Sequence, residues 1–180
     1  MLGPEHLQTL TSMQNLAVTY LYQRKYEEGE ELEIKVLDLH KKVLGLEHPQ
    51  TLTSMNTLAA AYIYQGKYEE AEVLWLKVLD LSTKVLGPEH PHTLISMENL
   101  ATTYSTQAKY DKAGELKAKV LDLREKMLGP EHPDTLTSIE KLATTYPNQG
   151  KYGKTEQLQM KMSNSGNPVD PADSSGINEW

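Results

Sequence analysis

The phrase Leu-Gly-x-Glu-His occurs four times, starting at Leu2, Leu44, Leu86 and Leu128, with a constant spacing of 42 residues. A fixed period of this length indicates one supersecondary unit copied in tandem, since each unit buries its hydrophobic face only against its neighbours. The second and third copies, residues 44–85 and 86–127, agree at 23 of 42 positions. The chain is therefore predicted to fold as a stack of repeats and not around a single compact core.

Each repeat carries two helical patterns, with apolar residues three and four positions apart. In the second repeat the first pattern comprises Leu52, Met55, Leu58, Ala59 and Tyr62, and the second comprises Tyr68, Ala71, Leu74, Val78, Leu81 and Val85. Residues 64–67 form a turn around Gly66, and Gly87-Pro88 ends the second helix. Pro91 suits the first turn of the next helix. No segment alternates with a period of two, so the predicted fold class is all-α.

The series Met55, Leu58, Ala59 and Tyr62, followed by Ala71, resembles the signature of the tetratricopeptide repeat (TPR). The same first-helix series recurs at Met13/Leu16/Ala17/Tyr20, Met97/Leu100/Ala101/Tyr104 and Ile139/Leu142/Ala143/Tyr146. The late aromatic residue of the signature is present only as Trp75, and Glu33, Lys117 and Gln159 stand at the corresponding positions. The repeats are eight residues longer than the 34-residue TPR, and the extra residues lie around the Leu-Gly-x-Glu-His corner.

Repeats of this length and with these sequence motifs resemble the TPRs of kinesin light chains and the TPR arrays of fungal NOD-like receptor (STAND NTPase) proteins. The resemblance implies a right-handed solenoid of antiparallel helix pairs, a TPR-like superhelix, over residues 1–162. The expected repeats are 2–43, 44–85, 86–127 and 128–162. Residues 163–180, rich in Ser, Pro, Asp and Gly, are expected to form a flexible C-terminal tail.

Composition and motifs exclude several classes of function. The net charge of −7, without clustered Lys or Arg, argues against nucleic-acid binding. No stretch approaches the roughly 18 apolar residues of a membrane span, and no secretory leader is visible. The absence of cysteine fits a cytoplasmic protein. No phosphate-binding loop, nucleophile motif or metal-ligand motif is present, so we expect no enzyme activity, no cofactor and no catalytic residue.

Four histidines, His6, His48, His90 and His132, recur at the corner of each repeat, beside a glutamate. Ligands of one metal ion must converge to about 2 Å from it. Equivalent corners are separated by two helices, and neighbouring helices already stand about 8–10 Å apart. We therefore expect these histidines to begin helices and not to bind a metal. The acidic clusters at Glu27–Glu31 and Glu69–Glu72 are expected to be solvated and to favour helix N-termini.

In the resembled family, the first helix of each repeat lines the concave surface with the face beside its core stripe. That face carries Gln14, Asn15, Val18, Leu21 and Tyr22, then Asn56, Ala60, Ile63 and Tyr64, then Glu98, Asn99 and Thr102, and finally Glu140. The first two repeats thus offer an apolar and aromatic floor, and the last two a polar floor with two carboxylates. These residues are predicted to form a peptide-binding groove, unless they only pack on neighbouring helices.

The predicted function is a non-enzymatic protein- or peptide-binding scaffold, whose ligand has an apolar anchor and basic residues. Two alternatives remain open: a structural module that assembles with itself, and a sensing domain of a larger STAND-type NTPase. Self-association is expected because Leu10 and Met13 at one end, and Leu158 and Met162 at the other, lack a capping helix. The turn position of Gly66 and Gly150, held by Arg24 and Ala108 in the other repeats, is expected to be left-handed.

Overall fold

The computed structural model describes residue 3 and residues 5–165, and within that range the chain forms helices and no strands. The helices are α1 (Leu7–Tyr22), α2 (Tyr26–Leu44), α3 (Pro49–Tyr64), α4 (Tyr68–Leu86), α5 (Pro91–Thr106), α6 (Tyr110–Leu128), α7 (Pro133–Ala143), the short 3-10 helix η1 (Tyr146–Gln149) and α8 (Tyr152–Ser165). Contacts divide the chain into a first part, residues 1–120, and a second part, residues 121–180.

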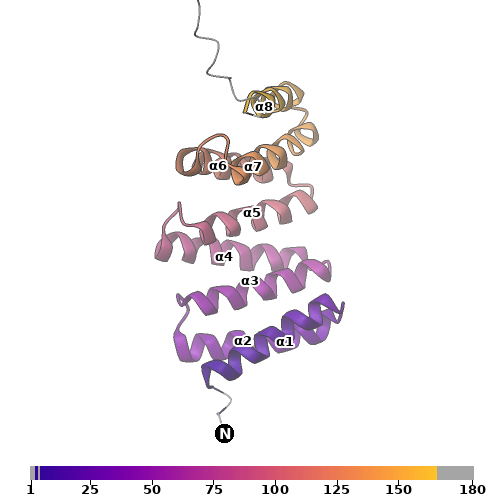
Figure 1. Ribbon diagram of the computed structural model, residues 1–180. Helices are drawn as coiled ribbons and strands as arrows, with labels where there is room; N and C mark the ends of the chain where they lie inside the picture. The colour runs from indigo at the N-terminus through magenta and orange to yellow at the C-terminus, as the bar shows by residue number, and fades with distance from the viewer. Residues whose placement is uncertain (1–2, 4, 166–180) are drawn as a thin grey trace, which may run out of the picture. The chain divides into compact units, whose positions relative to one another are not determined.

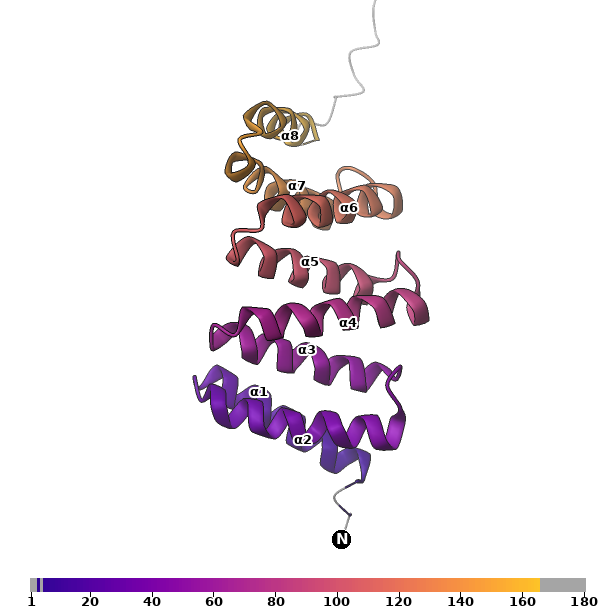
Figure 2. The ribbon, with the colours of Figure 1, turned by 180° about the vertical axis from the view of Figure 1, so that it is seen from behind.

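In the first part, helices α1 to α5 pack in chain order, each against the next, as antiparallel neighbours (Figures 1 and 2). Two buried clusters join consecutive helices: Leu37, Leu52, Met55, Leu58, Val78 and Leu81 in one, and Ala59, Ala71, Trp75, Leu100, Tyr104 and Ala113 in the other. Each cluster takes residues from at least three helices, so the repeats share one extended core. The predicted all-α class of stacked helix pairs is confirmed.

The corner phrase begins the first helix of each repeat. The Nδ1 atom of His48 accepts a hydrogen bond from the backbone N–H of Gln50 at 3.2 Å, which satisfies a donor that the helix leaves free. Pro49 occupies the first helical position, where its missing N–H removes no helical bond. The same N-cap recurs at His6, His90 and His132. The histidines therefore begin helices, as predicted.

The turn between the two helices of a repeat is left-handed in every repeat. Gly66 and Gly150 have φ values of 75° and 70°, and Arg24 and Ala108 have φ values of 61° and 58°. After Arg24, the backbone N–H of Lys25 donates to the carbonyl of Tyr20 at 2.9 Å, which closes the end of α1. The predicted conformation is confirmed, so the two non-glycine residues adopt a backbone conformation that disfavours a side chain.

Neighbouring repeats are joined by a recurring ion pair. Lys67 Nζ lies 2.7 Å from Glu30 Oε2, and Lys109 Nζ lies 2.6 Å from Glu72 Oε2. The hydrogen bond from Lys109 lowers the pKa of Glu72 below its ordinary value, and the hydrogen bond to Glu30 raises the pKa of Lys67. The expectation that the acidic clusters are only solvated was thus wrong for Glu30 and Glu72, whose side chains are 17% and 16% exposed.

The second part begins with the end of α6 and continues with α7, η1 and α8. Helix α7 has 11 residues, whereas α1, α3 and α5 have 16 each. Pro147 lies in η1, where its ring and missing N–H prevent a longer α-helix. Helix α8 ends at Ser165, slightly beyond the expected end near Ser163. Most of the predicted tail, residues 166–180, lies outside the described residues.

The exposed end of α1 differs in detail from the prediction. Leu10 is fully buried because α1 packs against α2, so its expected exposure was wrong. Leu16 is 44% exposed, whereas its counterparts Leu58 and Leu100 are 4% and 1% exposed. In α8, Leu158 is half-buried and Met160 is 66% exposed. Leu16 and Met160 are thus exposed although the pattern did not single them out.

Candidate functional site: a groove along the first helices

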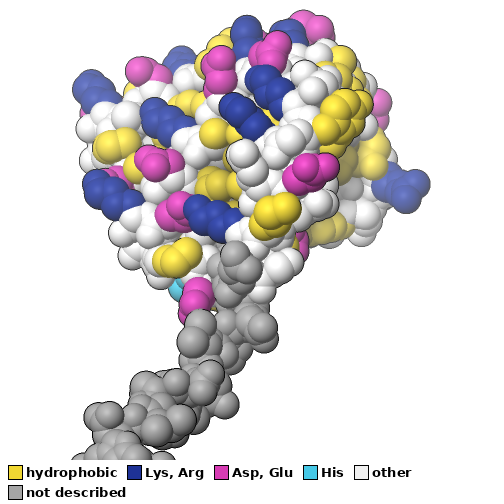
Figure 3. Space-filling view, turned by 90° about the horizontal axis from the view of Figure 1, so that it is seen from above, with side chains coloured by type: hydrophobic (Ala, Val, Ile, Leu, Met, Phe, Trp, Pro, Cys, Tyr) yellow, Lys and Arg dark blue, Asp and Glu magenta, His cyan; other side chains and the backbone are white. Residues whose placement is uncertain are grey.

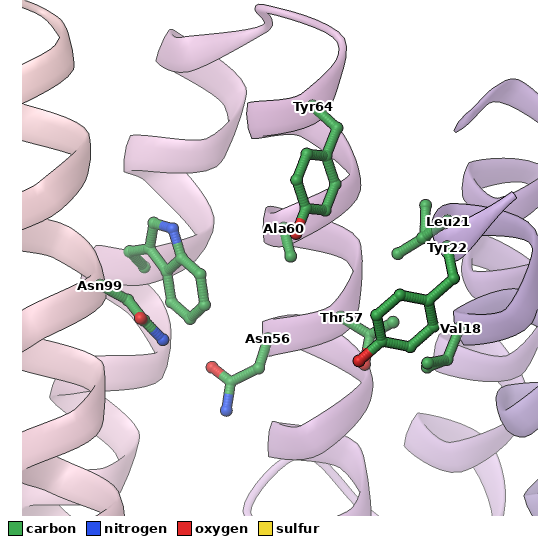
Figure 4. A pocket seen from close by; sticks show the side chains of 9 residues that line it. Val18, Leu21, Tyr22, Asn56, Thr57, Ala60, Tyr64 and Asn99 are labelled. Atoms are coloured by element: carbon green, nitrogen blue, oxygen red, sulfur yellow. The ribbon is translucent and has the colours of Figure 1, made fainter. Parts of the chain in front are cut away.

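A cavity of about 330 Å³ opens between α1, α3 and α5 in the first part of the chain (Figure 4). Its lining contains seven of the predicted groove residues: Val18, Leu21, Tyr22, Asn56, Ala60, Tyr64 and Asn99. The spacing of three, four and seven residues places such side chains on one side of each first helix. The floor is largely apolar, with a few amide groups at its edges.

A second cavity of about 160 Å³ extends the first along α3 toward the end of α5. It adds Ile63 and Thr102 from the predicted set, and it shares Ala60, Tyr64 and Asn99 with the larger cavity. The two cavities therefore form one continuous depression, which we call the first-helix groove. The exposed Tyr64 ring is held in place by stacking on Tyr26, with ring centroids 5.4 Å apart.

Trp75 is the main groove residue that the sequence analysis did not assign. It lines both cavities and is 4% exposed, although it belongs to the second helix of its repeat. Its indole Nε1 is buried and has no hydrogen-bond partner among the described residues. The signal was available, because Trp75 is the only aromatic residue at the late aromatic position of the TPR signature. Thr57 is a second residue of the lining that was not predicted.

The groove also holds a free acceptor. The side-chain oxygen Oδ1 of Asn56 is buried, and no group in the described range donates to it. In Figure 4 the side chain of Asn99 extends from α5 into the same space. A buried polar group without a partner costs about 1–3 kcal/mol, so the Asn56 oxygen and the Trp75 indole N–H each carry such a cost in this fold.

Four predicted site residues do not line the groove. The amide of Gln14 donates to the Ser54 hydroxyl at 3.2 Å, so its side chain is engaged between the helices and does not line the groove. Asn15 is exposed, and Glu98 is half-buried on α5. Glu140 lies on α7 in the second part of the chain, where it is exposed. The predicted combination of two carboxylates with an apolar floor thus stays a prediction.

A buried polar cluster lies beneath the first repeat boundary. Glu33, which replaces the tryptophan of the next repeat, is fully buried, and neither of its carboxyl oxygens has a hydrogen-bond partner in the described range. Burial raises the pKa of Glu33 to about 7; the polar groups of Ser54 and Gln14, which bond to each other and not to the carboxylate in good geometry, only partly offset this effect. His40 Nδ1 lies 2.8 Å from the Ser54 hydroxyl, and burial lowers the pKa of His40.

The second-helix side of the first part also has cavities, which the sequence analysis did not predict. The larger one, of about 450 Å³, lies between α2 and α4 and includes Ile34, Leu37 and Val73. A smaller one, of about 420 Å³, repeats it 42 residues later and includes Leu76 and Leu79. The polar lining residues of each cavity are charged side chains and one tyrosine, so both cavities lack the buried amide and indole of the first-helix groove.

Three surface properties bear on other partners. On the face drawn in Figure 3, basic and acidic side chains are interspersed, unlike the single-sign patch of a nucleic-acid site. Among the residues that the structure describes, no three His, Asp or Glu side chains converge as metal ligands. The described helices also include none that is long and apolar enough to cross a membrane.

Comparisons with known proteins agree with this architecture. The family model for the tetratricopeptide repeat matches residues 15–74 and 58–126. The crystal structure of a Podosopora anserina protein assigned as a kinesin light chain, with nearly identical TPR-like repeats, is 32% identical and has a TM-score of 0.82. That match covers 92% of this chain and 79% of the other. No curated protein sequence matches this chain.

Two other solved structures share the fold at lower identity. BtubC (BKLC) from P. vanneervenii is 18% identical with a TM-score of 0.79, and the match covers 96% of this chain and 70% of that one. The apo form of RapI is 17% identical with a TM-score of 0.75, covering 89% and 57%. The repeated helix pairs, the family model and the kinesin-light-chain similarity together show that the chain belongs to the tetratricopeptide repeat family.

Proposed function

We propose that this chain is a non-enzymatic scaffold that binds a peptide segment of a partner protein in the first-helix groove. Proteins of the tetratricopeptide repeat family are generally protein-interaction scaffolds, and this chain shares their repeated helix pairs. The specific assignment rests on the groove itself. Its main cavity, of about 330 Å³, is at the lower end of the usual range for ligand sites, about 300–1,000 Å³.

The observation that carries the proposal is the pair of unsatisfied groups in the groove. Asn56 Oδ1 is an acceptor without a donor, and Trp75 Nε1 is a donor without an acceptor. A peptide backbone supplies both an N–H and a carbonyl at each residue. Because both atoms are buried, their side chains must turn toward the ligand, and a main chain bound in the groove would then satisfy both groups, which an apolar ligand could not do.

The surrounding side chains indicate which peptide would fit. Val18, Leu21 and Ala60 form an apolar floor, and the Tyr64 ring stands beside it. An aliphatic or aromatic side chain of the ligand would fill this floor. The chain has a net charge of −7, so a ligand with basic residues beside its apolar anchor gains from long-range attraction.

Panning a displayed library of random peptides against the full 180-residue chain tests the proposal. Selected peptides should combine an apolar anchor with basic residues. The Ala60→Arg variant places a long side chain in the groove, and we expect it to weaken binding at least tenfold. Asn56→Ala removes the free acceptor and should weaken binding by about 1 kcal/mol or more.

The matched control is Ile95→Arg, because Ile95 is 45% exposed on α5 and lines neither groove cavity. This variant should keep the affinity of the unmodified chain. Selected peptides that bind Ala60→Arg as tightly as the unmodified chain would place the binding site elsewhere, for example on the second-helix side. The proposal would also be wrong if the library yields no peptide that binds.

A further inference from the structure

The outer face of α1 carries the side chains that join one repeat to the preceding one. Leu16 corresponds to Leu58, which is buried in the cluster that contains Leu37 of the preceding repeat. Tyr22 corresponds to Tyr64, which stacks on Tyr26 of the preceding repeat. In α1, however, Leu16 is 44% exposed and Tyr22 is 85% exposed. Leu16 and Tyr22 are therefore exposed and available for contact with another helix.

The same face carries an exposed lysine. Lys25 corresponds to Lys67 and Lys109, which pair with Glu30 and Glu72 of their preceding repeats. Among the described residues, Lys25 has no ion pair, and its ammonium group lies 5.7 Å from the Tyr20 ring centroid. A carboxylate that lay relative to Lys25 as Glu30 lies relative to Lys67 would therefore form the same ion pair.

Helix α8 presents the other half of this boundary. Tyr152, Glu156 and Met160 stand three repeat lengths after Tyr26, Glu30 and Ile34. Tyr152 and Met160 are 65% and 66% exposed, and Glu156 is exposed without an ion pair in the described range. Helix α8 therefore exposes an aromatic ring, a carboxylate and an apolar side chain. They occupy the same relative positions as Tyr26, Glu30 and Ile34, which face the second repeat.

We propose that α8 of one molecule seats α1 of a second copy in the register of an internal repeat boundary. Tyr152 then stacks on the partner's Tyr22, Glu156 pairs with the partner's Lys25, and Met160 covers the partner's Leu16. The first two contacts repeat contacts that the chain already makes between its own repeats, and the third places Met160 where Ile34 lines the cavity between α2 and α4 beside Leu58. The contact is head-to-tail, so it leaves a free face at each end and propagates along a filament unless a rotation closes it.

A second copy is favoured over an unrelated partner by complementarity at three matched positions. Aromatic faces aromatic, cation faces anion, and apolar faces apolar, all in one register. One position is poorer than inside the chain, because Ser163 replaces Leu37. The contact between copies is therefore weaker than the internal boundary, and assembly should depend on protein concentration.

Sedimentation equilibrium of the full 180-residue chain over a wide concentration range tests this contact. We expect the average mass to rise with concentration, and the rise to diminish at high salt because part of the attraction is an exposed ion pair. Lys25→Glu should place two carboxylates together, and Glu156→Lys should place two ammonium groups together. Each variant alone should weaken association at least tenfold.

Mixing the two variants provides the decisive measurement. In the mixture, α8 of either variant meets α1 of the other with opposite charges, so association should return toward that of the unmodified chain. Lys77→Glu is the control for net charge, because Lys77 is exposed on α4 away from both end faces, and it should associate normally. Thermal unfolding by circular dichroism verifies that each variant is folded.

Three outcomes would overturn the proposal. The unmodified chain could remain monomeric at every concentration. Association could persist unchanged in both Lys25→Glu and Glu156→Lys. The mixture could fail to restore what each variant alone has lost. The substituted positions lie outside the lining of the first-helix groove, so peptide binding by the variants can be measured independently.

Discussion

Replacing Glu33 by Gln should stabilise the protein near neutral pH and leave its stability unchanged in acid. Glu33 is fully buried, and its carboxyl oxygens lack hydrogen-bond partners among the described residues. Burial raises its pKa from the ordinary value of 4.5 to about 7, and the side chains of Ser54 and Gln14 oppose this effect only in part. Gln has nearly the same shape and cannot ionise, so the substitution removes the charge with little change in packing.

The direction of the pH effect depends on whether the folded or the unfolded chain binds more protons at Glu33. Below about pH 4.5 the carboxyl group is protonated in both states, and Glu33 costs no ionisation energy. As the pH rises toward about 7, the unfolded chain loses the proton while the folded chain keeps it, so unfolding becomes easier. The difference between the two pKa values corresponds to about 3 kcal/mol in the free energy of unfolding. Almost all of this stability is lost by neutral pH.

His40 contributes in the opposite direction. Burial, and secondarily the charge of His48, lower the pKa of His40, so its contribution to stability is lost as the pH falls through about 6.5. The pH profile of the unmodified chain combines both groups. Subtracting the profile of the Glu33→Gln variant isolates the contribution of Glu33, because His40 is common to both chains.

Urea unfolding followed by circular dichroism, at several pH values from about 4 to 8, measures this difference. We expect the free energies of unfolding to agree in acid and to diverge by up to about 3 kcal/mol at neutral pH. Glu31→Gln, an exposed substitution on the same helix, is the control and should show a nearly constant difference. Parallel profiles for the unmodified chain and the Glu33→Gln variant would refute the reasoning.

Three further predictions concern the repeats themselves. Arg24→Gly and Ala108→Gly relieve a left-handed backbone and should each stabilise by up to about 1 kcal/mol, whereas Gly66→Ala should destabilise; lower denaturant midpoints for both glycine variants would contradict this. His48→Ala removes an N-cap and should cost about 1 kcal/mol in urea unfolding, while His48→Asn should retain most of the stability; equal losses would argue against capping. Amide hydrogens near the end of α7 should exchange faster than those at the end of α5, because η1 replaces its last turns; equal protection in hydrogen exchange would count against this ranking.

The sequence determined the repeating architecture and its local geometry. The 42-residue period, the apolar spacing and the corner phrase predicted helix pairs, their turns and the histidines at the helix starts. Each of these depends on contacts within a few residues or on a pattern that recurs in every repeat. The left-handed conformation of Arg24 and Ala108 could be predicted for the same reason, since Gly66 and Gly150 occupy the equivalent position.

Periodicity also indicated nine residues that line the two cavities of the first-helix groove, because a helix puts residues three, four and seven apart on one side. It could not show that Trp75 reaches into the groove from a second helix, or that Gln14 turns inward to Ser54. It likewise assigned Glu30 and Glu72 to solvent, although each is paired with a lysine of the next repeat. Those outcomes depend on which side chains meet across neighbouring helices, about 40 residues apart in the sequence. Only the packing of one repeat on the next brings such side chains within hydrogen-bonding distance, and therefore only the tertiary structure decides which polar groups are satisfied and which remain free.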